Sequence, residues 1–180
     1  MSFLVRTVGA VGFAMLISTG AFAQVPADPA NPNEAVPDAM PVTPYGAPID
    51  LATAKKVAAA AVAETVKRNW QGMCIAVVGP TGDLVYFEKQ DNCQYASVTI
   101  SQHKARTAAR FRRPTVALEN AVQKFGFNYI LTLDDAIASR GGIPLIEDGK
   151  IIGAVGCSGG TGSQDEAVCT AAAATINKTQ

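Results

Sequence analysis

The stretch GGIPLIEDGKIIGAVGCSGGTGSQDEAVC, residues 141–169, decides the fold of this chain. Within it, the pair Asp148-Gly149 separates two apolar runs, residues 143–146 and residues 151–155. An Asp-Gly pair between apolar runs is typical of a tight hairpin, because both residues tolerate the positive φ that such a turn requires. The stretch therefore predicts two antiparallel strands.

A glycine-rich turn follows the second strand at residues 158–163. Ser163 and Glu166 stand in the Ser-x-x-Glu spacing of a capping box, so we expect a helix to start near Gln164. Backbone N–H groups at such a helix start can bind a carboxylate or a phosphate. The predicted anion-binding turn comprises Gly159, Gly160, Gly162 and Ser163. A turn that merely joins strand to helix is the alternative, and the absence of Gly-Lys-Ser/Thr excludes a Walker phosphate loop.

The first 23 residues have the features of a secretory signal peptide. Arg6 precedes an apolar centre at residues 8–17, and Ala21-Phe22-Ala23 forms a small-x-small cleavage site. A membrane span is the alternative, but the apolar run is shorter than the roughly 20 residues that a span needs. We therefore expect a periplasmic or secreted protein, cleaved near Ala23, with no membrane span.

The rest of the chain divides into a leader and one domain. Residues 24–48 are rich in proline and lack hydrophobic periodicity, which is typical of a disordered leader. Residues 49–180 are long enough for one domain with its own core. The chain carries 15 Lys plus Arg against 15 Asp plus Glu. This balance argues against a nucleic-acid partner, because phosphate contacts need a basic surface.

The remaining patterns predict an α+β fold. Helical periodicity is expected from Asp50, as the N-cap, to Trp70, and from Ser97, as the cap, to Phe111. Thr115 can cap a short third helix, and residues 134–139 are expected to add a helical turn. A first hairpin is expected from the runs 73–78 and 84–87. Two hairpins separated by helices predict a single mainly antiparallel sheet flanked by helices, a three-layer sandwich, with a two-layer arrangement as the alternative.

The helix at residues 97–111 carries the densest group of cations. Lys104 falls on an apolar and small stripe, so its ammonium must reach the edge or find a partner. His103, Arg106 and Arg110 follow the i, i+3, i+7 spacing on an adjacent face. As a group they form a candidate docking face for carboxylates. Taken singly, Arg106 and Arg110 are more typical of a solvated helix face than of a binding role.

The chain has four cysteines: Cys74, Cys93, Cys157 and Cys169. An exported protein permits disulfides, and three pairings are possible. The positions of the cysteines on the expected elements favour Cys74 with Cys93 and Cys157 with Cys169. A thiol nucleophile is the functional alternative. A structural zinc site is not expected, because no CxxC occurs and His103 is the single histidine.

Four motifs in order resemble the GlcG/HbpS-like haem-binding proteins, which are related to the C-terminal domain of PduO-type corrinoid enzymes. These motifs lie at residues 75–87, 104–115, 141–145 and 148–166. The resemblance implies an antiparallel sheet flanked by helices, a homo-oligomer, and a ligand beside or between subunits. The chain departs from the family pattern at Gly79, where an aspartate is usual. It also departs at residues 89–93, where it lacks a methionine that could have been an iron ligand.

Haem is the cofactor that this resemblance implies. By chemistry the possible iron ligands are His103, Lys104, Tyr95, Tyr129 and Met73. His103 leads because imidazole is a common strong ligand, and Arg106 and Arg110 are close enough in sequence to meet propionates. No CxxCH occurs, so binding would be non-covalent.

Two functions from different classes remain. The first is an exported, non-catalytic haem-binding protein that stores, carries or senses haem. The second is an accessory subunit or enzyme-like domain that binds a small organic acid at residues 158–163 and uses Asp165 or Glu166 as acid or base. Neither a Ser-His-Asp set nor a paired-carboxylate motif is evident, and both acids also suit a helix N-terminus, which favours binding over catalysis.

The intact mass of the protein recovered from the periplasm or the medium tests the export and disulfide predictions together. We expect a chain that begins at Gln24 and lacks two hydrogen atoms for each disulfide. The full-length mass would disprove cleavage, and thiols that react with an alkylating reagent without reduction would disprove the disulfides.

Overall fold

The computed structural model describes residues 42–177, so the predicted signal peptide and most of the predicted leader lie outside the described residues. The order of elements agrees with the sequence prediction. The elements are α1 (Leu51–Lys67), β1 (Cys74–Val78), β2 (Leu84–Lys89), α2 (Tyr95–Arg110), α3 (Thr115–Phe125), the 3-10 helix η1 (Asn128–Thr132), β3 (Gly142–Glu147), β4 (Lys150–Ser158) and α4 (Gly162–Ala173).

The four described strands form one antiparallel sheet in the order β2-β1-β4-β3. Each predicted hairpin is present, and the hairpins join through β1 and β4, where Cys74 pairs with Ser158. Asp148 and Gly149 form the predicted turn with φ of 48° and 71°. The central strand β1 is buried along its whole length, whereas the edge strand β2 is partly exposed.

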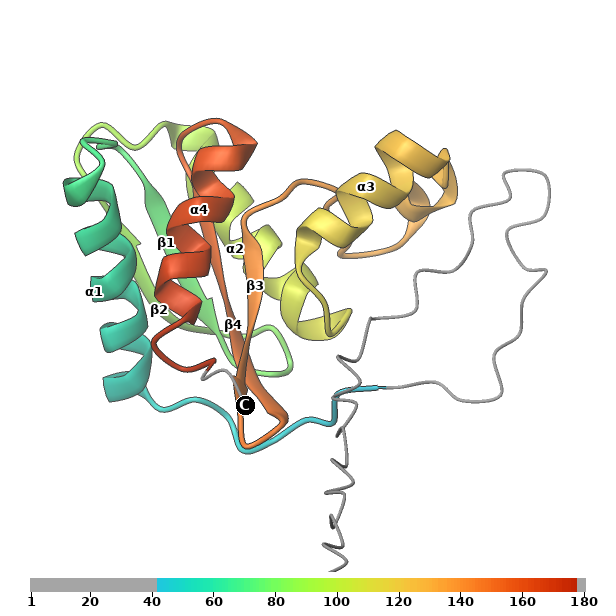
Figure 1. Ribbon diagram of the computed structural model, residues 1–180, viewed down its shortest axis with the longest axis horizontal. Helices are drawn as coiled ribbons and strands as arrows, with labels where there is room; N and C mark the ends of the chain where they lie inside the picture. The colour runs from blue at the N-terminus through green and yellow to red at the C-terminus, as the bar shows by residue number, and fades with distance from the viewer. Residues whose placement is uncertain (1–41, 178–180) are drawn as a thin grey trace, which may run out of the picture.

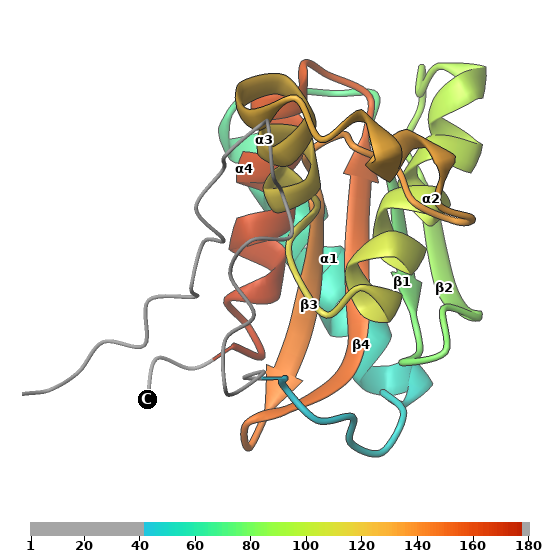
Figure 2. The same ribbon diagram turned by 90° about the vertical axis from the view of Figure 1, so that its right-hand side faces the viewer.

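Helices cover both faces of this sheet (Figures 1 and 2). Ile75, Val77 and Val155 point into a core shared with α1 and α4. The alternate residues Ala76 and Ala154 pack against α2. Because successive strand residues point to opposite faces, the central strands are apolar throughout. The predicted α+β three-layer sandwich is confirmed, and the two-layer alternative is wrong.

Glycines in β3 and β4 let α2 lie directly on the sheet. A Cβ atom at Gly156 would lie 2.1 Å from the carbonyl oxygen of Ser101, and one at Gly142 would lie 2.3 Å from that of Lys104. Any larger residue would push the helix away, so the small side chains fix the position of α2. Consequently the small-residue stripe of α2 faces its own sheet.

An N-terminal strap, residues 43–49, pairs with the start of β4. Gly46 donates to the carbonyl of Ile151, and Ile151 donates to the carbonyl of Pro44, both at 2.8 Å. The Tyr45 hydroxyl lies 3.1 Å from the carbonyl oxygens of Ala109 and Arg110 and donates to this pair at the end of α2. The sequence prediction assigns residues 43–48 to the leader, but in the structure they are part of the domain.

Asp50 caps α1 as predicted, but the start of α4 differs from the prediction. Thr161 is the N-cap of α4, and it forms the capping box with Gln164. The prediction of Ser163 with Glu166 is wrong because the helix begins one residue beyond Thr161, which places Ser163 inside its first turn.

Two further predicted caps and one predicted turn are also wrong. Gln94 precedes α2, and Ser97 lies inside the helix with its hydroxyl 2.9 Å from that of Ser158. Pro114 precedes α3, so Thr115 is its first residue and accepts a hydrogen bond from Gly142 N–H. The extra helical turn is η1, not residues 134–139, which are irregular.

Candidate functional site

A buried ion pair links the two helical layers. The Lys104 Nζ atom of α2 lies 2.7 Å from Asp165 Oδ2 of α4 and 3.3 Å from the carbonyl oxygen of Cys157, to which it also donates. The two side chains are only 2% and 4% exposed. Lys104 has therefore found the partner that its apolar stripe required, and its ammonium is not available to a bound cofactor. The prediction of Lys104 as a haem-binding residue is wrong for this reason.

The glycine-rich turn binds the same aspartate. Gly160 N–H donates to Asp165 Oδ1 at 3.0 Å, and Thr161 N–H donates to Gln164 Oε1 at 2.9 Å. Of the residues predicted to bind an external anion, Gly160 thus binds a side chain of the protein itself. Gly162 packs beside Arg140, and Ser163 is exposed. The carboxylate of Asp165 already lies at the turn, which argues against an external acid at residues 158–163.

Asp165 sits in an environment that disfavours its charge. Burial raises the pKa of its carboxyl above the ordinary value, while the Lys104 ammonium and the N–H groups of Gly160 and Gly159 act in the opposite direction. Glu166, the other acid considered as a catalyst, lies 3.4 Å from Arg140 Nη1. Both carboxylates are therefore held by cations of the fold.

Both disulfides have the pairing favoured by the sequence. Cys74 is bonded to Cys93 and Cys157 to Cys169, with Cα atoms 5.9 and 5.7 Å apart. No cysteine within residues 42–177 is free, so a thiol nucleophile has no candidate there. No group of three potential metal-ligating side chains occurs in the same region.

The cationic face of α2 is only partly open. The Arg110 guanidinium donates to the carbonyl of Thr81 at 2.8 Å and forms an ion pair with Asp135, which also lies 3.8 Å from Arg106. The Thr107 hydroxyl donates to the carbonyl of Asp135 at 2.8 Å. The chain near Asp135 therefore crosses α2 between the level of His103 and that of Arg110. The Asp135 carboxylate therefore already pairs with both arginines that were expected to bind propionates.

The structure narrows the set of possible iron ligands. Met73 is buried and Lys104 is paired, so neither faces a ligand. His103 is half-buried and makes no side-chain hydrogen bond to any other residue between 42 and 177. Tyr95 is 91% exposed and Tyr129 is also exposed. His103 and the two tyrosines remain.

Sequence reasoning missed a second ion-pair cluster around Arg140. Its backbone N–H and its Nε both donate to the Glu119 carboxylate at 2.7 Å, and Glu119 is largely buried. Neither Glu119 nor Asp135 stood in a motif. Their partners lie 21 and 25 residues away in sequence, a separation at which no local pattern reports contact.

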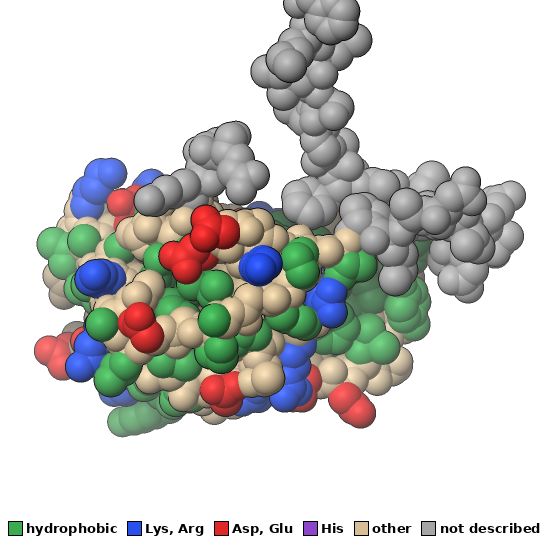
Figure 3. All heavy atoms as spheres, turned by 90° about the horizontal axis from the view of Figure 1, so that it is seen from below, with side chains coloured by type: hydrophobic (Ala, Val, Ile, Leu, Met, Phe, Trp, Pro, Cys, Tyr) green, Lys and Arg blue, Asp and Glu red, His purple; other side chains and the backbone are tan. Residues whose placement is uncertain are grey.

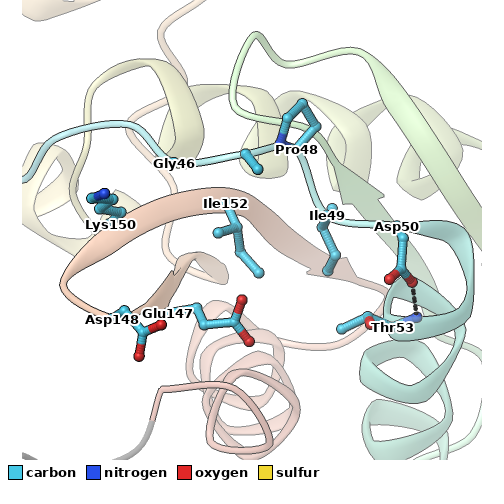
Figure 4. A pocket seen from close by; sticks show the side chains of 10 residues that line it. Gly46, Pro48, Ile49, Asp50, Thr53, Glu147, Asp148, Lys150 and Ile152 are labelled. Carbon is cyan, nitrogen blue, oxygen red and sulfur yellow. Dashed lines mark hydrogen bonds between the residues drawn. The ribbon is translucent and has the colours of Figure 1, made fainter.

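Two hollows adjoin the N-terminal strap. The first, with a volume of about 310 Å³, lies between the strap, the β3–β4 turn and the start of α1, and Figure 4 shows Glu147, Asp148 and Lys150 around it. Asp50 at its edge caps α1 by accepting from Thr53 N–H. The second, of about 530 Å³, is lined by Tyr45, Gly46, Pro48, Pro80, Thr81 and Arg110.

The surface of the domain carries charges of both signs. Positive and negative side chains are interspersed over the face seen in Figure 3. None of the helices within residues 42–177 is long and apolar enough to cross a bilayer.

This architecture defines a class of small α+β sandwich domains in which a four-stranded antiparallel sheet is covered by helices on both faces. The chain belongs to the HbpS-like family, whose model, described as "Haem degrading protein HbpS-like", matches residues 49–174.

Similar proteins agree with this assignment. Protein GlcG of Escherichia coli K12 is 42% identical over 105 residues, which cover 58% of this chain and 77% of GlcG. The crystal structure of Klebsiella pneumoniae protein ORFY is 28% identical with a TM-score of 0.67, covering 81% of this chain and 99% of ORFY. The structure of PduOC in complex with haem is 23% identical with a TM-score of 0.65, covering 72% and 96% of the two chains, and this likeness concerns the fold.

A double-mutant cycle tests the buried ion pair. Lys104→Met leaves the Asp165 carboxylate without its cation, and we expect it to lower the free energy of unfolding by about 3–5 kcal/mol. The double variant Lys104→Met with Asp165→Leu removes both charges and should be less destabilised than Lys104→Met alone, as measured by urea unfolding. The single variant Asp165→Leu completes the cycle, and a double variant whose loss equals the sum of the two single losses would show that the pair is not coupled.

Proposed function

We propose that this protein is an exported protein that binds haem non-covalently and stores, carries or senses it without acting as an enzyme. The observation that carries haem as the ligand is membership of the HbpS-like family over residues 49–174, whose description names haem and its degradation. The proposal of binding without catalysis rests instead on the pairing of Asp165 and Glu166 with cations of the fold. The likeness of the fold to PduOC, whose structure holds haem, supports the same ligand.

The chemistry of the available side chains fits haem. His103 offers an imidazole that the described part of the fold does not use, on the outward side of α2. Bound haem would supply an iron centre that takes such a ligand. Arg106 and Arg110 lie on the same helix and carry more positive charge than Asp135 neutralises. Held in this way, the arginines can donate to propionates and the imidazole can ligate the iron.

The absence of catalysis is part of the proposal. Asp165 and Glu166, the acids that the alternative function needed, are paired with Lys104 and Arg140. In the turn predicted to hold a small acid, Gly160 N–H already donates to Asp165. These contacts make a small-acid enzyme or accessory subunit the weaker proposal.

Export is supported by the signal-like N-terminus and by the cysteines. Both disulfides are intramolecular, and disulfides form and persist in oxidising compartments. These two features together support a periplasmic or extracellular location.

A homo-oligomer, which the family resemblance implies, is also part of the proposal. The stripe of α2 packs on its own sheet and offers no free surface. Exposed apolar side chains instead gather on and just after η1, where Leu131 is 63% exposed beside Tyr129 and Leu133. Such a group of neighbouring apolar residues favours contact with another subunit.

Titration with haemin tests haem binding and the ligand. The mature protein should give a saturable shift of the Soret band, and His103→Ala should change that spectrum and weaken binding more than about tenfold, or at least about 1.4 kcal/mol. Gln102→Ala is the matched control, since this neighbouring side chain contacts only the Val98 carbonyl. A stable Soret band over hours separates binding from haem breakdown.

Three outcomes would contradict parts of this proposal. Failure of the wild-type protein to shift the spectrum removes haem as the ligand. An unchanged band in His103→Ala moves the ligand to Tyr95 or Tyr129. Loss of the Soret band on incubation with a reductant and oxygen would show an enzyme that degrades haem.

Light scattering tests assembly. We expect a mass above that of one chain at micromolar concentration, and Leu131→Asp should lower it because a charge cannot be buried at an apolar contact without cost. Val66→Asp, at an exposed apolar residue of α1, is the control. A monomeric wild-type protein would overturn the proposal.

A further inference from the structure

The groove between the N-terminal strap and the β1–β2 turn has the features of a ligand site. Its walls come from distant parts of the chain, the strap residues Tyr45 and Pro48 on one side and Pro80 and Thr81 on the other. Arg110, from the last turn of α2, stands at its edge and is 45% exposed. The volume is about 530 Å³.

The walls of this groove are held in place before any ligand arrives. The hydroxyl of Tyr45 is fixed on the end of α2, and Arg112 stacks over its ring with the guanidinium carbon 4.3 Å from the ring centre. The strap is bonded to β4 through Gly46 and Ile151. Pro48 and Pro80 have restricted backbones, so little conformational entropy remains to be lost on binding.

Polar groups that could bind a ligand are few in this groove. Pro48 and Pro80 have no backbone N–H, and the Tyr45 hydroxyl already donates to helix carbonyls. Arg110 uses its Nε on the Thr81 carbonyl and its Nη1 on Asp135, while Nη2 makes no hydrogen bond within residues 42–177. The groove therefore offers apolar surface with one guanidinium donor at its edge.

Positive charge is concentrated at one edge of the groove. Arg110 lines this edge with Arg106 and Arg112 nearby, and the carboxylates that face these arginines are Asp135, which pairs with Arg106 and Arg110, and Asp83, which accepts from the Thr81 hydroxyl. The acids of the adjoining hollow, among them Asp50 and Glu147, lie on the side of Gly46 and Pro48, which line both hollows. An anionic group on the ligand is therefore favoured at the Arg110 edge.

We infer that this groove binds a flat apolar molecule through one carboxylate, with the apolar body against Tyr45, Pro48 and Pro80 and the carboxylate on Arg110. This inference rests on the proposed function, because haem is the ligand proposed there and a porphyrin is a flat apolar molecule that carries propionate carboxylates. A smaller aromatic carboxylate has the same chemistry. The iron ligand is a separate matter, because the groove contains no unused imidazole, phenol or thioether.

The experiment measures three ligands on the intact mature protein: haemin, metal-free protoporphyrin IX and 2-naphthoate, each followed by absorbance or by quenching of Trp70 fluorescence. Arg110→Ala should weaken porphyrin binding about tenfold through loss of a charged hydrogen bond, without changing the Soret position of bound haemin. Thr81→Glu should weaken it by a similar factor, because a carboxylate at the groove edge repels the ligand and competes for Arg110.

Arg113→Ala is the matched control. This arginine is exposed, lies three residues beyond Arg110 and bonds only to the Phe111 carbonyl among the described residues, so its loss should leave affinity unchanged. If Arg110→Ala fails to fold, as judged by circular dichroism, Thr81→Glu decides the matter, since it keeps every contact of Arg110 with the backbone.

The outcomes separate the inference from the proposed function. Haemin binding that is equal in wild type, Arg110→Ala, Thr81→Glu and Arg113→Ala overturns the groove as the site and leaves haem binding in place. Binding of 2-naphthoate, but of neither porphyrin, that is lost in Arg110→Ala supports the groove with a smaller ligand and overturns haem as its occupant. Absence of binding by all three ligands overturns both.

Discussion

The buried contact between Lys104 and Asp165 is the interaction on which the rest of the structure depends. Placing two charges away from water costs several kcal/mol per ion, and their attraction offsets this cost only when the remaining hydrogen-bond groups are also satisfied. Here the carbonyl of Cys157 accepts from the ammonium, and Gly160 N–H donates to the carboxylate. Because Lys104 belongs to α2 and Asp165 to α4, the pair joins the two helical layers at one end of the sheet.

This contact also decides which residues remain for function. The lysine, the glycine-rich turn and the first acids of α4 form the most conspicuous chemistry in the sequence, and the fold uses all of them internally. A ligand must therefore be recognised elsewhere. Two such places are the outward side of α2, where the His103 side chain makes no hydrogen bond within residues 42–177, and the groove beside Arg110.

The fold could be predicted from the sequence because its signals are local. The Asp148-Gly149 turn adopts the positive φ that the pair allows, and alternating burial follows from the strand period. The disulfide pairing could be predicted because strand and helix ends had been placed approximately. Helix starts were less accurate, since Ser97 and Thr115 are good caps in isolation but bond instead to Ser158 and to Gly142 of the sheet.

The candidate site could be predicted only in part, because its contacts are long-range. Lys104 was expected to need a partner, yet Asp165 lies 61 residues further on. The crossing of Asp135 over α2 and the packing of Tyr45 on the helix end have no sequence signal of their own. Tyr45 and Pro48, which lie in the predicted leader, form one wall of the groove because the strap pairs with β4. Such a tertiary contact cannot be predicted from composition.

The two ends of the sheet differ in how they are cross-linked. At one end, β1 begins at Cys74 and β4 ends at Ser158, which are paired. The Cys74–Cys93 bond leads towards the start of α2, and the Cys157–Cys169 bond leads to α4 on the other face. Together with the ion pair, these bonds fix both layers at this end.

At the other end no disulfide or buried ion pair occurs among the described residues, and the strap, the β1–β2 turn and the last turn of α2 meet there. The disulfides and the buried ion pair hold the helices against the sheet at the first end. The second end can therefore keep an open apolar surface without loss of the fold. The groove beside Arg110 lies at this end, away from the disulfides and the buried Lys104–Asp165 pair, and its edge is held by the exposed ion pair of Arg110 with Asp135. An apolar hollow with one charged group at its edge is the kind of surface that accepts a small ligand.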